Sequence, residues 1–194
     1  MDLTEHSFLQ VFFIVLWIMM PAYLSNTFAV ITGGKFPIDQ GKIHSDGNRI
    51  LGDGKTWSGL IGGTFGGLVI GYLQINHGNI VIDTIANSKN YNFWGENSLA
   101  IIFLLAFGAL LGDMTASFFK RRKKLNRGDK SPLLDMFDFI GMALFLTLIF
   151  DPAWLKSWIL DGYAPLFTLL VATPLLHRGV NIIGYKLGIK NEPW

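Results

Sequence analysis

The sequence predicts an all-α integral membrane protein with five transmembrane helices. The chain has 194 residues, of which 51% are hydrophobic and only 15% are charged, whereas charged residues make up roughly 25% of a soluble domain. Five apolar segments approach the length of about 20 residues that a membrane-spanning helix needs. Strands with alternating apolar and polar residues are missing from the sequence, which disfavours a membrane β-barrel.

The five segments are predicted to form one membrane domain, residues 1–194, because no linker divides the chain. The predicted spans are residues 8–31, 56–76, 98–119, 133–151 and 162–183. The first span could also be a signal peptide, but no basic residue precedes it and no small-residue cleavage site follows it, which favours an uncleaved helix. The short apolar run at residues 80–85 predicts a small hairpin or an interfacial segment.

The distribution of Lys and Arg predicts the orientation of the helices. Of the 16 basic residues, four lie in the loop 32–55, seven in the loop 120–132 and three near the C-terminus. The N-terminus carries none, and each of the two remaining loops carries one. Basic loops stay in the cytoplasm. The pattern therefore predicts a multi-pass protein of the cell membrane with its N-terminus outside, its C-terminus in the cytoplasm and two polar cytoplasmic loops.

Glycine recurs every fourth residue along the second predicted span, at Gly59, Gly63, Gly67 and Gly71. This spacing places a smooth face along one side of a helix. Such a face allows close packing between helices in a membrane, and it could alternatively form a groove that admits a lipid chain. The sequence alone leaves both interpretations open.

Three carboxylates lie at the predicted cytoplasmic ends of the spans. Asp113 lies near the end of the third span, and Asp135 and Asp138 share one face at the start of the fourth. Carboxylates in such segments are costly and usually functional. Because Mg²⁺ takes oxygen ligands and leaves room for phosphate, the three are predicted to be catalytic and to hold Mg²⁺ as the cofactor. Asp135 and Asp138 could also simply complement the helix dipole, whereas Asp113 near a helix C-terminus needs a partner.

Further candidates follow Asp113 along the same stretch. Ser117 and Lys120 share its helical face, and Arg121 comes next. We expect Lys120 to be catalytic and Ser117 and Arg121 to bind substrate. The remaining basic residues of the loop, 122–124, are equally typical of a topology signal or a patch for lipid headgroups.

A second candidate stretch is GDGKTWSG at residues 52–59. Glycine, lysine and threonine at the start of a helix can cradle phosphate through backbone N–H groups and the lysine charge. The spacing is not that of a Walker A loop. We expect Asp53, Gly54, Lys55 and Thr56 to contribute to substrate binding.

These two stretches carry a resemblance to a known family. GKTWSG followed by Ile61-Gly62-Gly63 resembles the GKTWEG…IGG stretch of the CDP-diacylglycerol synthases. The order Gly112-Asp113, Ser117-x-x-Lys120-Arg121, Gly128-Asp129 and Asp135-x-x-Asp138 resembles the signature of that family. The short chain and its five predicted spans look most like the archaeal branch, the CDP-archaeol synthases. Three departures are Pro132-Leu133-Leu134 in place of the bacterial His-Gly-Gly, Met136 in place of an arginine, and a basic neighbour of Asp129 that follows it as Lys130.

The resemblance implies a Mg²⁺-dependent nucleotidyltransferase of phospholipid biosynthesis, with its active site on the cytoplasmic side. It implies that CMP passes from CTP to an ether-linked lipid phosphate of the bilayer, unsaturated archaetidic acid (2,3-bis-O-geranylgeranyl-sn-glycerol 1-phosphate). The products would be CDP-archaeol and pyrophosphate. Asp129 joins the substrate-binding residues by its place in the signature. No nucleic-acid partner is expected, and the resemblance does not predict an oligomeric state.

Two other functions are weaker interpretations of the same residues. A CDP-alcohol phosphotransferase would carry a D-G-x-x-A-R signature, which the sequence lacks. An ion-coupled or proton-coupled transporter could use Asp113 as its ion site, but transporters tend to show internal repeats, and no repeat is visible here. The residues that select cytidine are not evident; Asp39, Asp46 and Asn48 are candidates in the first basic loop.

Overall fold

The computed structural model describes residues 6–86, 93–125, 129 and 131–188, and every regular element in this part of the chain is a helix. The helices are α1 (Phe8–Thr32), α2 (Trp57–Ala86), α3 (Ser98–Arg122), α4 (Pro132–Phe150), α5 (Pro152–Trp158) and α6 (Tyr163–Lys186). The predicted all-α fold class is therefore confirmed.

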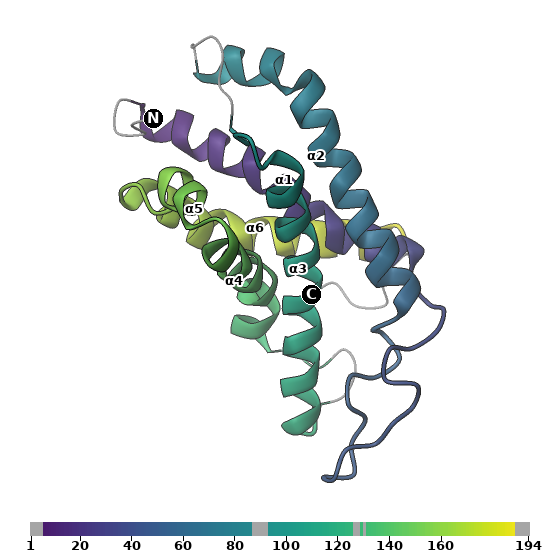
Figure 1. The fold of residues 1–194 in the computed structure, drawn as a ribbon. Helices are drawn as coiled ribbons and strands as arrows, with labels where there is room; N and C mark the ends of the chain where they lie inside the picture. Colours follow the sequence, from purple (N-terminus) through teal and green to yellow (C-terminus); the bar gives the residue numbers. More distant parts are fainter. Residues whose placement is uncertain (1–5, 87–92, 126–128, 130, 189–194) are drawn as a thin grey trace.

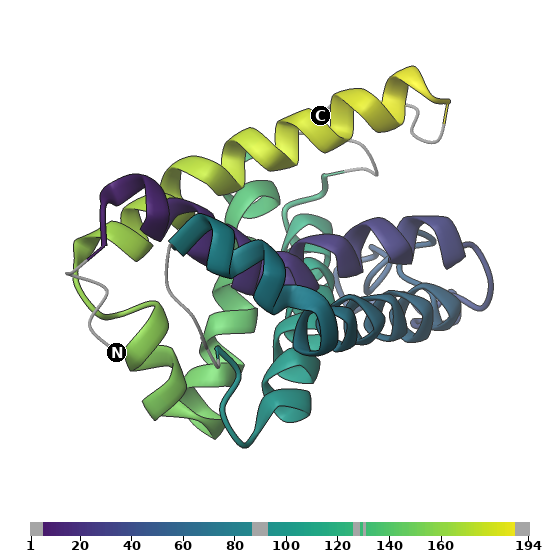
Figure 2. The same cartoon turned by 90° about the horizontal axis from the view of Figure 1, so that it is seen from above.

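The helices form a bundle around α1 (Figures 1 and 2). α1 packs on α2, α3 and α6, and α3 packs along α4. The middle of α1 supplies a large part of the apolar core, including Ile14, Ile18 and Met19, which are fully buried. The loop 33–56 projects from one end of the bundle beside the C-terminal end of α3 (Figure 1). We call this region, with the start of α4, the loop end.

Four helical segments of the described chain are long and apolar enough to cross a membrane. They are Phe8–Thr32, Trp57–Gly78, Ser98–Arg122 and Tyr163–Lys186. The remaining predicted span coincides with α4, which has 19 residues and contains Asp135 and Asp138. The five-span topology and its orientation stay predictions.

Local sequence signals account for the ends of α1. Ser7 accepts a hydrogen bond from Gln10 N through its hydroxyl at 3.3 Å, and Gln10 Oε1 accepts one from Ser7 N at 2.9 Å. This reciprocal pair satisfies two backbone donors that a helix start leaves free. The helix ends before Gly33 and Gly34, and Gly34 has a φ of +96°, a conformation that favours glycine.

The glycine face of α2 is filled by protein. A Cβ atom added to Gly63 would lie 2.7 Å from the carbonyl oxygen of Ser25 on α1 and 2.9 Å from a methyl of Leu110 on α3. One added to Gly67 or Gly71 would overlap side chains of α3. α2 therefore lies against both helices at close range, which supports the packing interpretation over a lipid groove.

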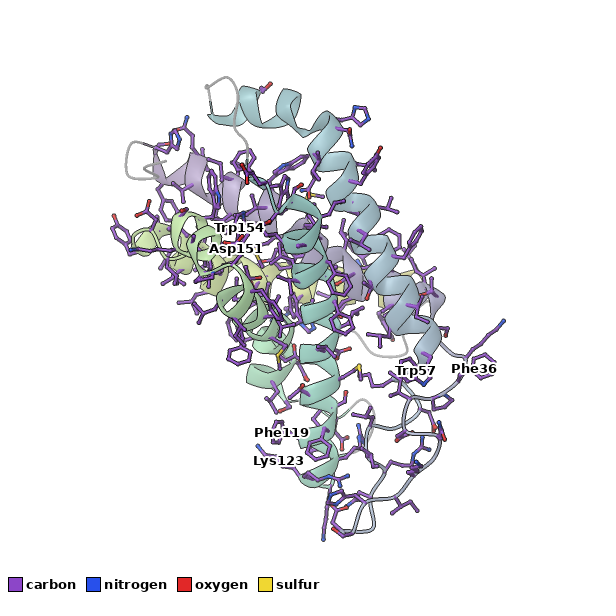
Figure 3. All side chains as sticks on the ribbon, in the orientation of Figure 1. Phe36, Trp57, Phe119, Lys123, Asp151 and Trp154 are labelled. Carbon is purple, nitrogen blue, oxygen red and sulfur yellow. The ribbon has the colours of Figure 1, made fainter. Side chains whose placement is uncertain are left out.

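The end of the bundle opposite the loop end is held by aromatic side chains. Trp154 Nε1 donates a hydrogen bond to the carbonyl of Phe93 at 2.6 Å, and the ring of Trp154 stacks on Trp94 at 6.2 Å between centroids. Phe93 also lies against Trp158, with ring centroids 5.0 Å apart. We call Phe93, Trp94, Trp154 and Trp158 the aromatic end. Figure 3 places Trp154 far from Phe119 and Lys123 at the end of α3.

Two local predictions differ from the structure. The run 80–85 is not a hairpin: α2 continues through it to Ala86. Gly78 packs on the ring of Trp17, with its added Cβ 3.0 Å from Trp17 Cζ2, so this part of α2 still has a partner in α1. The short helix α5 was not foreseen, although Asp151 followed by Pro152 is a typical helix start. Asp151 Oδ1 accepts a hydrogen bond from Trp154 N at 3.0 Å.

Candidate active site

The predicted carboxylates lie where α3 and α4 pack backbone against backbone. A Cβ atom added to Gly108 would lie 2.8 Å from the Cα atom of Ala143, and one added to Gly112 would overlap the backbone carbonyl of Asp138. Two small residues four apart permit this approach between membrane helices. Because Asp113 directly follows Gly112, this packing brings Asp113 and Asp138 to the same level of the helix pair.

α3 continues for nine residues beyond Asp113, so this carboxylate lies inside a membrane-length helix, where a charge needs a partner, and Lys55 supplies it. Lys55 Nζ lies 2.5 Å from Asp113 Oδ2. Lys55 is held at the start of α2, because the buried hydroxyl of Thr56 accepts a hydrogen bond from Gly59 N at 3.2 Å and caps the helix. The side chains of Lys55 and Asp113 remain 20% and 41% exposed. The pair therefore stays accessible to a ligand.

A second ion pair joins α3 to α4, between Lys120 Nζ and Asp135 Oδ1. The other carboxylate oxygen of Asp135 accepts a hydrogen bond from Ser131 N at 2.9 Å. The carboxylate of Asp135 thus complements the positive end of the helix dipole at the N-terminus of α4, as the dipole interpretation predicts, and it also binds Lys120. The helix-dipole interpretation of Asp135 is supported by this geometry, while its role as a catalytic metal ligand stays a prediction.

Asp138 lies close enough to Asp113, Asp135 and Lys55 for their charges to act on its carboxylate. Its Oδ1 accepts a hydrogen bond from Phe139 N at 2.6 Å. In the part of the chain that the structure describes, no three His, Asp or Glu side chains gather closely enough to hold a metal ion. The predicted metal ligands therefore lie in the same region, but their carboxylates do not meet around one point. Lysines bind two of them, Asp113 and Asp135.

The loop 33–56 is organised around a buried carboxylate, Asp39. Arg49 donates two hydrogen bonds to it, from Nη2 at 2.6 Å and from Nε at 3.1 Å. The backbone N–H groups of Leu51 and Gly52 donate to the same carboxylate at 3.0 and 2.9 Å. These donors, Arg49 first, hold the pKa of Asp39 well below its usual range. Its side chain is fully enclosed, so Asp39 shapes the loop and is not available to contact a base.

Arg122 fastens this loop to α3, a role that the sequence did not indicate. Its Nη2 donates to the carbonyl of Arg49 at 2.5 Å, and its Nη1 lies 3.3 Å from Asp46 Oδ1. The guanidinium carbon also lies 5.0 Å from the centre of the Phe118 ring. In the sequence, Arg122 is one of the basic residues 122–124, which are typical of a topology signal or a patch for lipid headgroups, and that pattern does not indicate this contact.

The other predicted binding residues occupy the same end of the molecule. Arg121 lies beside Gly52 and donates to the carbonyl of Leu125, and its Nε is buried without a hydrogen-bond partner. Asp53 is 71% exposed and pairs with Arg49 at 2.9 Å. The rest are Gly54, exposed before Lys55; Ser117, half-buried between Asp113 and Lys120; and Asp129, exposed before α4. Gly128 and Lys130 lie outside the described residues.

Comparison with known proteins agrees with the resemblance on which this site was predicted. Residues 8–194 match a family model described as "CarS-like: CDP-archaeol synthase". The chain belongs to the CDP-archaeol synthase family. This family membership confirms the predicted resemblance.

Relatives in this family match the chain over nearly all of its length. The CDP-archaeol synthase of Methanospirillum hungatei JF-1 is 49% identical over 176 residues, which is 91% of this chain and 100% of the relative. That of Methanosarcina barkeri is 43% identical over 186 residues, with the same coverage. The chain is also similar to a solved structure described as an intramembrane enzyme for archaeal membrane lipids biosynthesis. That structure is 35% identical, with a TM-score of 0.64, covering 86% of this chain and 92% of that one. Together with the apolar helices, these matches identify a membrane enzyme of lipid biosynthesis with a nucleotidyltransferase-type reaction.

Proposed function

We propose that this member of the CDP-archaeol synthase family transfers CMP from CTP to unsaturated archaetidic acid, giving CDP-archaeol and pyrophosphate, on the cytoplasmic face of the cell membrane. One observation carries the proposal beyond family membership. Three carboxylates and three cationic side chains come from separate elements to the loop end: Asp113, Asp135, Asp138, Lys55, Lys120 and Arg121.

The reaction asks little of the protein in covalent chemistry. A phosphate oxygen of the lipid attacks the α-phosphorus of CTP, a new P–O bond forms, and the bond to pyrophosphate breaks. Because the nucleophile is already an anion, no strong base is needed. The task is to align two polyanions and to offset their charge. Lys55, Lys120 and Arg121 are placed to do so, and charge-assisted hydrogen bonds to phosphate are the strong ones.

The donor set at this site fits Mg²⁺ in its chemistry, since Asp113, Asp135 and Asp138 offer the carboxylate oxygens that this ion prefers. These three residues would hold it. When bound, Mg²⁺ supplies charge neutralisation and orientation for the triphosphate. Lys55 and Lys120 bind two of these carboxylates in the structure, so loading the ion requires these lysines to move.

The place of the site suits a lipid substrate. The site extends from Lys120 and Asp135, near the end of α3 and the start of α4, to Asp113 and Asp138, which lie nine and six residues from those helix ends. A lipid phosphate held at the bilayer surface can reach this level without leaving the membrane. The excess of Lys and Arg in the two loops on this side supports the cytoplasmic orientation.

The test is an assay of purified protein with labelled CTP, Mg²⁺ and the ether-linked lipid phosphate, run beside ester-linked phosphatidic acid. We expect CDP-lipid from the ether substrate, and its loss in Asp138→Asn. Product from the ester lipid alone would overturn the lipid assignment. No product from either lipid, together with no Mg²⁺-dependent binding of CTP, would overturn the cytidylyltransferase proposal and favour transport.

A further inference from the structure

Two ion pairs at the loop end connect helices through predicted site residues. Lys55–Asp113 joins the start of α2 to α3, and Lys120–Asp135 joins α3 to α4. All four side chains keep between 18% and 41% exposure. In each pair, a predicted phosphate-binding lysine therefore neutralises a predicted metal-binding carboxylate, within reach of solvent.

The pair between Arg49 and Asp39 shows what a fixed ion pair looks like in the same loop. Asp39 is completely enclosed and receives backbone N–H groups in addition to Arg49. Lys55 and Lys120 instead carry a point charge on a flexible four-carbon stem, and within the part of the chain that the structure describes each ammonium contacts one carboxylate only. Such a stem can move to a new anion while the helices that carry it stay in place.

The charges decide which ligand can separate these pairs. A divalent cation that binds the carboxylates alone leaves two ammonium groups unpaired beside it. A triphosphate that takes the lysines alone leaves the carboxylates unpaired beside a polyanion. Either state places like charges together at the partly desolvated end of a membrane helix, where water screens them less than in bulk. When both ligands arrive, every charge finds an opposite partner.

We propose that Lys55 and Lys120 are exchangeable counter-ions. When the metal binds the carboxylates of Asp113 and Asp135, the two lysines move from these carboxylates to the nucleotide triphosphate. Neither ligand therefore binds well without the other. This inference rests on the proposed function and specifies how the binding of each ligand at that site depends on the other. A coupling of this kind is reciprocal. The metal raises the affinity for CTP by the same factor as CTP raises the affinity for the metal, typically about 5- to 150-fold.

The exchange can be observed without turnover. A carbodiimide joins a lysine to a carboxylate only where the two touch, and mass spectrometry of the full chain in detergent then identifies the bond. We expect Lys55–Asp113 and Lys120–Asp135 cross-links in the free protein. They should persist with Mg²⁺ alone or CTP alone and disappear when both are present. Lys55→Met must abolish the first cross-link, and Lys123→Met, which changes an exposed lysine of the same stretch, must leave both intact.

Binding measurements provide a second test of the proposed exchange. With Mn²⁺ as a paramagnetic probe, Lys55→Met should bind the metal alone roughly tenfold more tightly and CTP alone more weakly, and should lower the coupling between the two. Lys120→Met should do the same, which guards against one variant that folds poorly. Cross-links that survive saturation with both ligands would overturn the inference while the proposed function stands. Failure of Mg²⁺ and CTP to bind together would overturn the proposed function itself.

Discussion

The two ends of the bundle are held together by different physics. At the aromatic end, four buried rings pack together and the indole N–H of Trp154 is satisfied by the carbonyl of Phe93. At the loop end, partly exposed charges join α2 to α3 through Lys55–Asp113 and α3 to α4 through Lys120–Asp135. Rings that are buried and satisfied stabilise a fold, whereas exposed ion pairs contribute little to stability. The aromatic end is therefore suited to hold the helices, and the loop end to exchange partners.

The largest effect on stability is expected at the aromatic end. Trp154→Ala removes the stack on Trp94 and the hydrogen bond to Phe93, and should lower the free energy of unfolding by about 3–5 kcal/mol. Activity per folded molecule should stay near that of the wild type, because the site lies at the other end. Denaturation in detergent and an assay of the folded fraction measure the two quantities. Trp57→Ala, which changes a half-exposed ring, is the matched control and should cost far less stability.

At the loop end, a substitution should lower activity strongly and stability only slightly. Lys120→Met should lower kcat/KM by a factor on the order of 10²–10³, the usual cost of losing one group that stabilises developing charge. Stability should change by less than about 1 kcal/mol, because the ion pair is partly exposed. Kinetics and denaturation of the same preparation test both statements, with Lys123→Met as the control. A Lys120→Met protein that unfolds as easily as Trp154→Ala would show that this pair is structural.

A single methyl group should connect stability with function at the contact between α3 and α4. Gly112→Ala adds a Cβ atom that overlaps the carbonyl of Asp138, and should destabilise the protein by about 1–3 kcal/mol through overpacking. The displaced helices would also separate Asp113 from Asp138, so activity should fall further than the folded fraction does. Gly141→Ala on α4 is the control, because its added methyl meets open space. Equal behaviour of the two variants would contradict the role given to this contact.

The sequence predicts this architecture well where one local pattern decides it. The all-α class, the apolar length of four helices and the close packing at the α2 glycines follow from the sequence, because membrane helices and their packing depend on residues close together in the chain. The need of Asp113 for a partner also follows from the sequence, because a carboxylate within an apolar segment of membrane length is costly. That the partner is Lys55, 58 residues away, depends on how α2 lies against α3.

The rest of the site depends on the path of a loop, which no periodicity encodes. Asp39 was a candidate for base recognition, yet the turn that brings Arg49 and Gly52 around it encloses its carboxylate. Arg122 looked like one more charge of a basic loop, but it fastens that loop to α3. Both assignments need tertiary contacts, so only the structure separates shaping residues from residues that can meet a ligand.

The smallest effect is expected from the buried carboxylate that shapes the loop, and it depends on pH. The folded-state pKa of Asp39 is lowered, chiefly by Arg49. Its contribution is therefore complete above the unfolded value of about 3.9 and is lost as pH falls through the lower, folded value. At pH 6, Asp39→Asn should speed hydrogen exchange at the amides of Leu51 and Gly52 by about tenfold, or about 1.4 kcal/mol of local opening.

The ratio of exchange rates between the variant and the wild type isolates this carboxylate, because the intrinsic chemistry of exchange is the same in both. The ratio should fall toward one as pH drops well below 3.9, where Asp39 takes up a proton in the wild type. Amides of α3 near Ala109, a buried residue that is distant from Asp39 in the sequence, should show no such change in the ratio. A ratio that stays constant with pH would mean that shape rather than charge holds the loop, and that Arg49 closes around Asp39 without needing its ionised form.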